Sequence, residues 1–161
     1  MKKEIEFLIE RLVRQEISQL LEYAHPRKEF IYRVENLIKQ VIIHLCLIKY
    51  NRFLHVEEYV EHWKSELFGW INSLANMDIK KNNSPSNRLD AVMEAMNNMD
   101  YLTNINKIKN CIVPKARKEN MDINSKAMEY AINECQIALP HIASIIANND
   151  MIGCDNFIKN L

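Results

Sequence analysis

The sequence predicts an all-α protein, a single-domain bundle of six or seven helices around a buried second helix. Apolar residues recur every three or four positions along most of the 161 residues, and no segment shows the alternation of a strand. Residues 41–48 are apolar except at His44, and a helix that is apolar nearly all round is buried. We therefore expect Leu45 at the centre of the bundle and His44 bonded to a backbone carbonyl.

The first half of the chain predicts three helices. Residues 3–24 carry one continuous apolar stripe, and we expect Pro26 to end this helix because the residue before a proline is disfavoured in the helical region. Residues 27–50 form the central helix, and residues 56–77 carry the next stripe. The helices of residues 3–24 and 56–77 are expected to pack around the central one.

The second half begins after a polar segment, residues 80–86, which marks a loop and a possible subdomain boundary, with Ser84 as a helix cap. Residues 89–108 keep helical spacing but contain several asparagines, so they predict two helices or a bend. The last long stripe, residues 128–146, stays in phase through Pro140, which favours one kinked helix. A short terminal helix follows.

Composition excludes several classes of protein. The 21 basic and 21 acidic side chains cancel, so no global field directs the chain to nucleic acid or to an anionic membrane. No apolar run approaches the ~20 residues that span a bilayer, and the N-terminal residues do not form a signal peptide. The four cysteines lack Cys-x-x-Cys spacing and predict reduced, buried thiols. A cytoplasmic location and no cofactor are expected.

One set of side chains has metal-ligand chemistry. His55, Glu58, His62 and Glu66 are predicted on one side of the third helix, and imidazole and carboxylate groups at such spacings bind divalent metals. A metal-dependent hydrolase is therefore one hypothesis. The alternative, which the sequence favours, is a solvated acidic face with two ordinary histidines. No catalytic residue is assigned, and a non-enzymatic protein is favoured.

The one basic cluster surrounds a predicted helix junction, without an acidic residue among its members. Such a cluster can hold phosphates, but it lacks the interleaved aromatic residues that stack on bases. The alternative is a solvated surface. The cluster consists of Lys107, Lys109, Lys115, Arg117 and Lys118.

Tyr50, Phe53 and Tyr59 flank the turn after the central helix or lie off the core stripe of the next helix. Aromatic residues in such places are candidates for an interface. They predict a partly exposed patch that binds a partner or a second copy of the chain. The alternative is that they cover the end of the bundle.

Three short segments within residues 33–100 carry a family resemblance. They are His44-Leu45 with Lys49-Tyr50, then Trp63, then Ser84-Pro85-Ser86 with Arg88-Leu89. They resemble the bacterial family of small helical proteins known as domain of unknown function twenty-nine. The resemblance implies a helical bundle and no particular activity.

These observations favour a small helical module that binds another protein, such as an immunity or antitoxin-like protein, an adaptor or a subunit of a complex. The main alternative is contact with phosphate or RNA through the basic cluster. The metal-dependent hydrolase is the third hypothesis.

Overall fold

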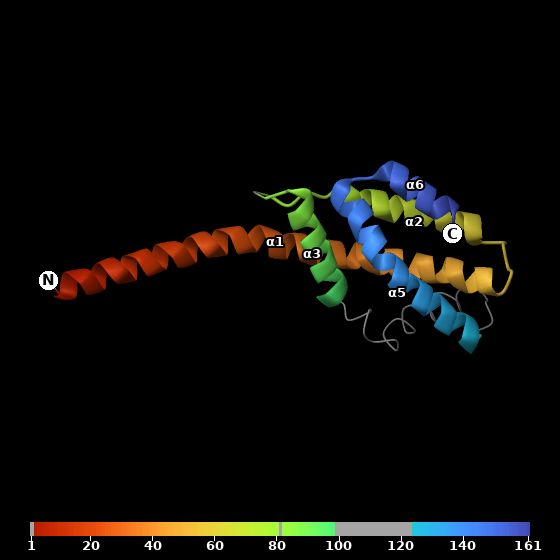
Figure 1. Cartoon of the computed structure of the whole chain (residues 1–161), viewed down its shortest axis with the longest axis horizontal. Coiled ribbons are helices and arrows are strands. Elements are labelled where there is room, and N and C mark those ends of the chain that lie inside the picture. Colours follow the sequence, from red (N-terminus) through yellow and green to blue (C-terminus); the bar gives the residue numbers. More distant parts are fainter. Residues whose placement is uncertain (1, 81, 99–123) are drawn as a thin grey trace.

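The computed structural model describes residues 2–80, 82–98 and 124–161, except for the side chains of residues 2–4 and 22–24. This part of the chain contains helices and no strand, which confirms the all-α prediction. It forms five helices, so the expected number of six or seven is not matched. They are α1 (Lys2–Phe53), α2 (Val60–Ala75), α3 (Pro85–Asn98), α5 (Ser125–Asn148) and α6 (Met151–Lys159) (Figure 1).

Helix α1 runs without a break through Pro26, so the prediction that Pro26 ends the first helix is wrong. The 52 residues of α1 span about 78 Å at the helical rise of 1.5 Å per residue. Proline costs a helix roughly 3 kcal/mol because it lacks the N–H donor, but it does not forbid the helix. The apolar phase continues across it, since Ile17, Ile31 and Ile38 are separated by multiples of seven residues.

The C-terminal half of α1 is the centre of the bundle, as predicted. Helices α2, α3 and α5 all pack against α1, and Leu45 is completely buried. His44 is buried as well, and its Nδ1 lies 2.7 Å from the carbonyl oxygen of Gln40. The carbonyl can only accept, so Nδ1 carries the proton, which confirms the expected bond to the backbone.

The C-terminal helices begin at side-chain caps. The side chain of Asn124 accepts a hydrogen bond from the backbone N–H of Ala127, 3.0 Å away, at the start of α5. Helix α5 continues through Pro140, as its apolar phase predicts. Asp150 caps α6 by accepting from the N–H of Gly153, so α6 begins before that glycine.

Helix α3 joins the two halves of the described chain. Ser84 caps it as predicted, since the backbone N–H of Asn87 donates to the Ser84 hydroxyl at 3.3 Å. Arg88 on the next turn is 7% exposed, and its Nη2 donates to the carbonyl oxygens of Ala75 at 2.7 Å and Ile146 at 3.1 Å. Buried side chains from both sides of residues 80–86 belong to one hydrophobic core.

The predicted helices of residues 89–108 can be compared with the structure only as far as Asn98, where α3 ends. The rest of that segment lies outside the described residues. None of the described helices has a stretch long and apolar enough to cross a lipid bilayer.

Candidate functional site

The N-terminal half of α1 extends away from the bundle, and no other described helix lies beside it (Figure 1). Its aliphatic side chains are 48% to 68% exposed. The expectation that this segment packs around the central helix is therefore wrong. Because α1 passes through Pro26 without a turn, its first half cannot fold back onto its second half. We call the exposed set the α1 stripe: Ile5, Leu8, Ile9, Leu12, Val13, Ile17, Leu20 and Leu21.

The α1 stripe continues the face by which α1 enters the core. Leu20 and Val13 lie fourteen and twenty-one residues before the buried Val34, so they share its heptad phase. At roughly 100 Å² for each half-exposed aliphatic side chain, the stripe leaves on the order of 800 Å² of apolar surface, more than the largest patch of a typical monomer. Exposed apolar patches of this size are typical of interaction sites.

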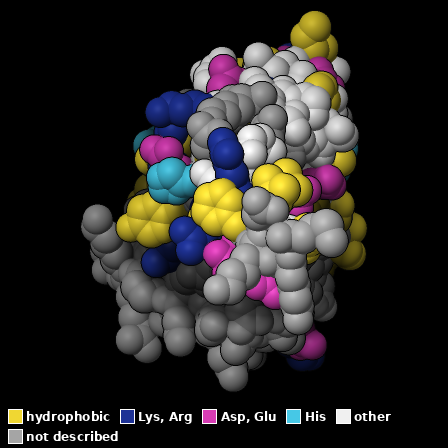
Figure 2. Space-filling model, turned by 90° about the vertical axis from the view of Figure 1, so that its left-hand side faces the viewer, with side chains coloured by type: hydrophobic (Ala, Val, Ile, Leu, Met, Phe, Trp, Pro, Cys, Tyr) yellow, Lys and Arg dark blue, Asp and Glu magenta, His cyan; other side chains and the backbone are white. Residues whose placement is uncertain are grey.

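Charged side chains of both signs accompany the α1 stripe. Residues 5–21 contain three acidic side chains and two basic ones. Seen from the free end of α1, hydrophobic, acidic and basic side chains are mixed over the described part of the surface (Figure 2). Residues 5–21 therefore carry no excess of basic charge.

Arg27 holds α1 to the bundle at the point where the helix enters it. Its Nη2 lies 2.8 Å from Oε2 of Glu94, and its Nη1 lies 3.1 Å from Oδ1 of Asn87, both on α3. The first fully packed residue of α1, Phe30, follows one turn later. The part of α1 that precedes Arg27 therefore extends outside the core as a helix.

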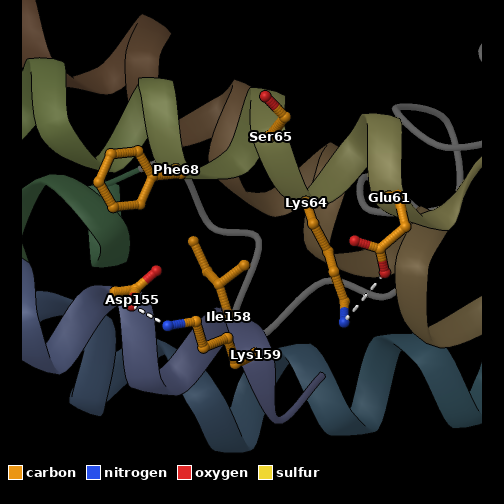
Figure 3. Close-up of a pocket in the computed structure, with 7 residues that line it drawn as sticks. All are labelled: Glu61, Lys64, Ser65, Phe68, Asp155, Ile158 and Lys159. Atoms are coloured by element: carbon orange, nitrogen blue, oxygen red, sulfur yellow. Dashed lines mark hydrogen bonds and ion pairs between the residues drawn. The ribbon is translucent and has the colours of Figure 1, made fainter.

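A hollow of about 470 Å³ lies between α2 and α6. Glu61, Lys64 and Phe68 of α2 face Asp155, Ile158 and Lys159 of α6 across it (Figure 3). Each lysine is paired with an acid of its own helix, Lys64 with Glu61 at 3.5 Å and Lys159 with Asp155 at 2.5 Å. The lining thus has neither an unpaired charge nor a nucleophile beside a base, so it does not form a catalytic set.

The four predicted metal ligands do not come together as one set. Helix α2 begins at Val60, so His55 and Glu58 precede it, and His55 has a left-handed backbone with φ of 56°. The prediction that all four residues share one side of a helix is therefore wrong. No group of three or more His, Cys, Asp or Glu side chains among the described residues could hold a metal ion.

Glu66, one of the predicted ligands, instead contacts two histidines. Its Oε2 lies 2.7 Å from Nε2 of His44, and its Oε1 lies 3.6 Å from Nε2 of the exposed His62. Both nitrogens of the buried imidazole therefore face an acceptor, the second being the carbonyl of Gln40. This arrangement satisfies a buried polar group and joins α1 to α2.

The predicted aromatic patch is only partly exposed. Tyr50 is buried, and its hydroxyl accepts a hydrogen bond from the N–H of Asn124 at 2.7 Å, so its inclusion in an exposed patch is wrong. Phe53 and Tyr59 are 41% and 36% exposed, and each lies against another ring. A role of Phe53 and Tyr59 in partner binding stays a prediction.

The basic cluster of Lys107, Lys109, Lys115, Arg117 and Lys118 lies outside the described residues, so phosphate binding there stays a prediction.

The cysteines that the structure describes are buried, as expected for Cys46 and Cys135. Burial raises the pKa of the Cys154 thiol to about 11, and the charges of Asp155 and Asp150 act in the same direction. A buried thiol with a raised pKa is protonated at neutral pH and therefore a poor nucleophile. Cys154 does not provide a reactive centre.

Comparison with known proteins finds no protein-family model, no curated protein and no solved structure that matches the chain significantly. The resemblance to domain of unknown function twenty-nine therefore stays a prediction.

Proposed function

We propose that this protein works by binding another protein chain and that the α1 stripe is its binding surface. The observation that carries the proposal is that eight aliphatic side chains, 48% to 68% exposed, form one face of a helix outside the bundle. In proteins most of the stability of a helix comes from packing of its apolar face, and the first half of α1 has no such packing among the described residues. A partner on the stripe would supply that packing.

The geometry of the α1 stripe favours recognition of a helix or of an apolar groove. Its residues recur at three- and four-residue intervals, which is the spacing by which amphipathic helices bind grooves and form coiled coils. The stripe continues the core-facing side of α1, so a partner placed on it would extend the hydrophobic core of the bundle. This arrangement suits an adaptor or a subunit of a complex, in which one half of a helix is held by its own domain.

The experiment compares two adjacent substitutions on opposite faces of α1. Ile17→Glu places a carboxylate in the stripe, whereas Ser18→Glu places the same group on the polar face. Both variants and the unchanged chain are affinity-purified from cells, and the chains that accompany them are quantified. We expect Ile17→Glu to lose the accompanying chain by at least about tenfold, since burial of an unpaired carboxylate costs well over 1.4 kcal/mol.

Ser18→Glu should retain the same partner as the unchanged protein. Circular dichroism shows whether both variants keep their helix content. Equal recovery with all three proteins, or recovery of no specific chain with the unchanged protein, would contradict the proposal.

A further inference from the structure

We infer that the partner of the α1 stripe is a second copy of this chain, paired antiparallel about a two-fold axis near Leu12. This inference rests on the proposed function and names the partner. Three features carry it: the area of the stripe, the position of two opposite charges beside it, and the mixed character of its polar residues.

The area agrees with a symmetric pair of helices. The roughly 800 Å² of apolar surface on one stripe equals what each partner contributes to a stable interface of standard size. A two-fold axis covers the same surface on both copies at once, and it is the commonest symmetry of soluble homo-oligomers. Each copy would thus cover the surface that the other leaves exposed.

The charges beside the stripe favour the antiparallel direction. Glu10 and Arg14 are four residues apart, so they lie on the same side of α1, where Glu10 has the heptad phase of Ile17 at the edge of the stripe and Arg14 lies further toward the polar face. In an antiparallel pair centred on Leu12, Glu10 of each copy lies level with Arg14 of the other. The symmetry then forms two oppositely charged pairs. A parallel pair in register would set each of these residues level with its own like charge.

In the same register, residues 5–19 of the two copies run alongside one another. Leu12 lies level with its own copy, Ile17 lies level with Phe7, and Ile5 lies level with Gln19, so the pairing spans six of the eight side chains of the α1 stripe. It stops before Arg27, where α3 packs against α1. The two bundles therefore lie at opposite ends of the paired helices.

A lipid surface is a poorer occupant of the stripe. Helices that lie on anionic membranes have a polar face rich in lysine and arginine, whereas residues 5–21 contain three acidic and two basic side chains.

The first test measures the mass of the purified full-length chain by light scattering at 50 mM salt. We expect a concentration-dependent dimer.

Glu10→Arg and Arg14→Glu alone should each raise the dimer dissociation constant about tenfold, because two attractive pairs become repulsive. An equimolar mixture of the two variants should restore pairing. Effects within one helix cannot produce such a recovery. Arg11→Glu, on the opposite face, is the matched control and should leave the dissociation constant unchanged.

The second test determines direction by disulfide trapping in a Cys111→Ser background. Two cysteines must have Cα atoms within about 7 Å to form a disulfide. A mixture of Ile5→Cys with Gln19→Cys should cross-link into a heterodimer, and neither variant should do so alone, since fourteen residues of helix span about 21 Å. Cross-linking of Ile5→Cys to itself, with none in the mixture, would overturn the antiparallel arrangement.

The remaining outcomes separate this inference from the proposed function. A monomer at every concentration up to about 100 µM, where even a pair with a Kd of 10 µM would form, overturns self-pairing. If such a monomer retains a different chain that Ile17→Glu releases, the proposed function stands alone. If it has no stripe-dependent partner, both fail, and stripe-dependent binding to phosphatidylserine vesicles would assign the surface to lipid instead.

Discussion

Replacing Arg88 by methionine should lower the free energy of unfolding by about 3–5 kcal/mol, among the largest effects of any single substitution in this protein. The buried guanidinium donates to the carbonyls of Ala75, the last residue of α2, and Ile146, near the end of α5. Helix C-termini carry partial negative charge, so these two ends stabilise the buried cation. Methionine fills the stem of the side chain but leaves both carbonyls without this donor. The measurement is equilibrium urea unfolding followed by tryptophan fluorescence.

Arg27→Met provides the matched control, since Arg27 also joins a helix to α3 but is partly exposed, as is its partner Glu94. An exposed ion pair contributes only about 0.2–1 kcal/mol. Arg88→Lys keeps a positive charge and should recover part of the lost stability. The recovery should be incomplete, because the ammonium lacks the planar fork of the guanidinium. A loss below about 1 kcal/mol for Arg88→Met would show that the buried arginine does not hold the helix ends together.

Leu45→Ala should cost about 2–5 kcal/mol, from the lost transfer free energy and from the cavity that remains. Leu45 is completely buried where α1 meets the surrounding helices. Leu12→Ala is the same substitution on the same helix, but at a residue 61% exposed. Its cost should stay within about 0.5 kcal/mol when unfolding of the bundle is measured at protein concentrations low enough to keep the chain monomeric. Similar losses at both positions would contradict the division of α1 into a core half and an exposed half.

The centre of the fold was predictable because its signal is strong and local. A run that is apolar on every side, residues 41–48, leaves burial as the only low-energy environment for a helix. The continuation of α5 through Pro140 followed from the uninterrupted phase of its apolar residues. Caps such as Ser84 were likewise readable, since they depend on one side chain and a neighbouring backbone N–H.

The continuity of α1 is hard to predict from the sequence, because a proline such as Pro26 commonly ends a helix. As at Pro140, the apolar phase continues across Pro26, since Ile17, Ile31 and Leu45 share one heptad phase. A proline changes the local free energy by about 3 kcal/mol, which a long helix with a buried second half can tolerate. The consequence is large, because an unbroken helix removes its first half from the bundle and leaves the α1 stripe exposed.

The predicted sites depend on the residues at which helices begin and end, and sequence patterns locate helix ends poorly. The start of α2 at Val60 separates His55 and Glu58 from His62 and Glu66. Tyr50 flanks the turn after the central helix, which predicts exposure, yet it is buried and its hydroxyl accepts a hydrogen bond from the N–H of Asn124 at the start of α5. The contacts of Arg88 with two helix ends are long-range and have no signature in the sequence.

Site-specific photo-crosslinking tests the central claim most directly, namely that the α1 stripe contacts another protein chain. A benzophenone amino acid is incorporated at Leu12, within the stripe, or at the neighbouring Arg11 on the polar face, and living cells are irradiated. We expect a discrete protein adduct of one defined mass from position 12, and little or none from position 11. No adduct from either position, or equal adducts from both, would contradict it.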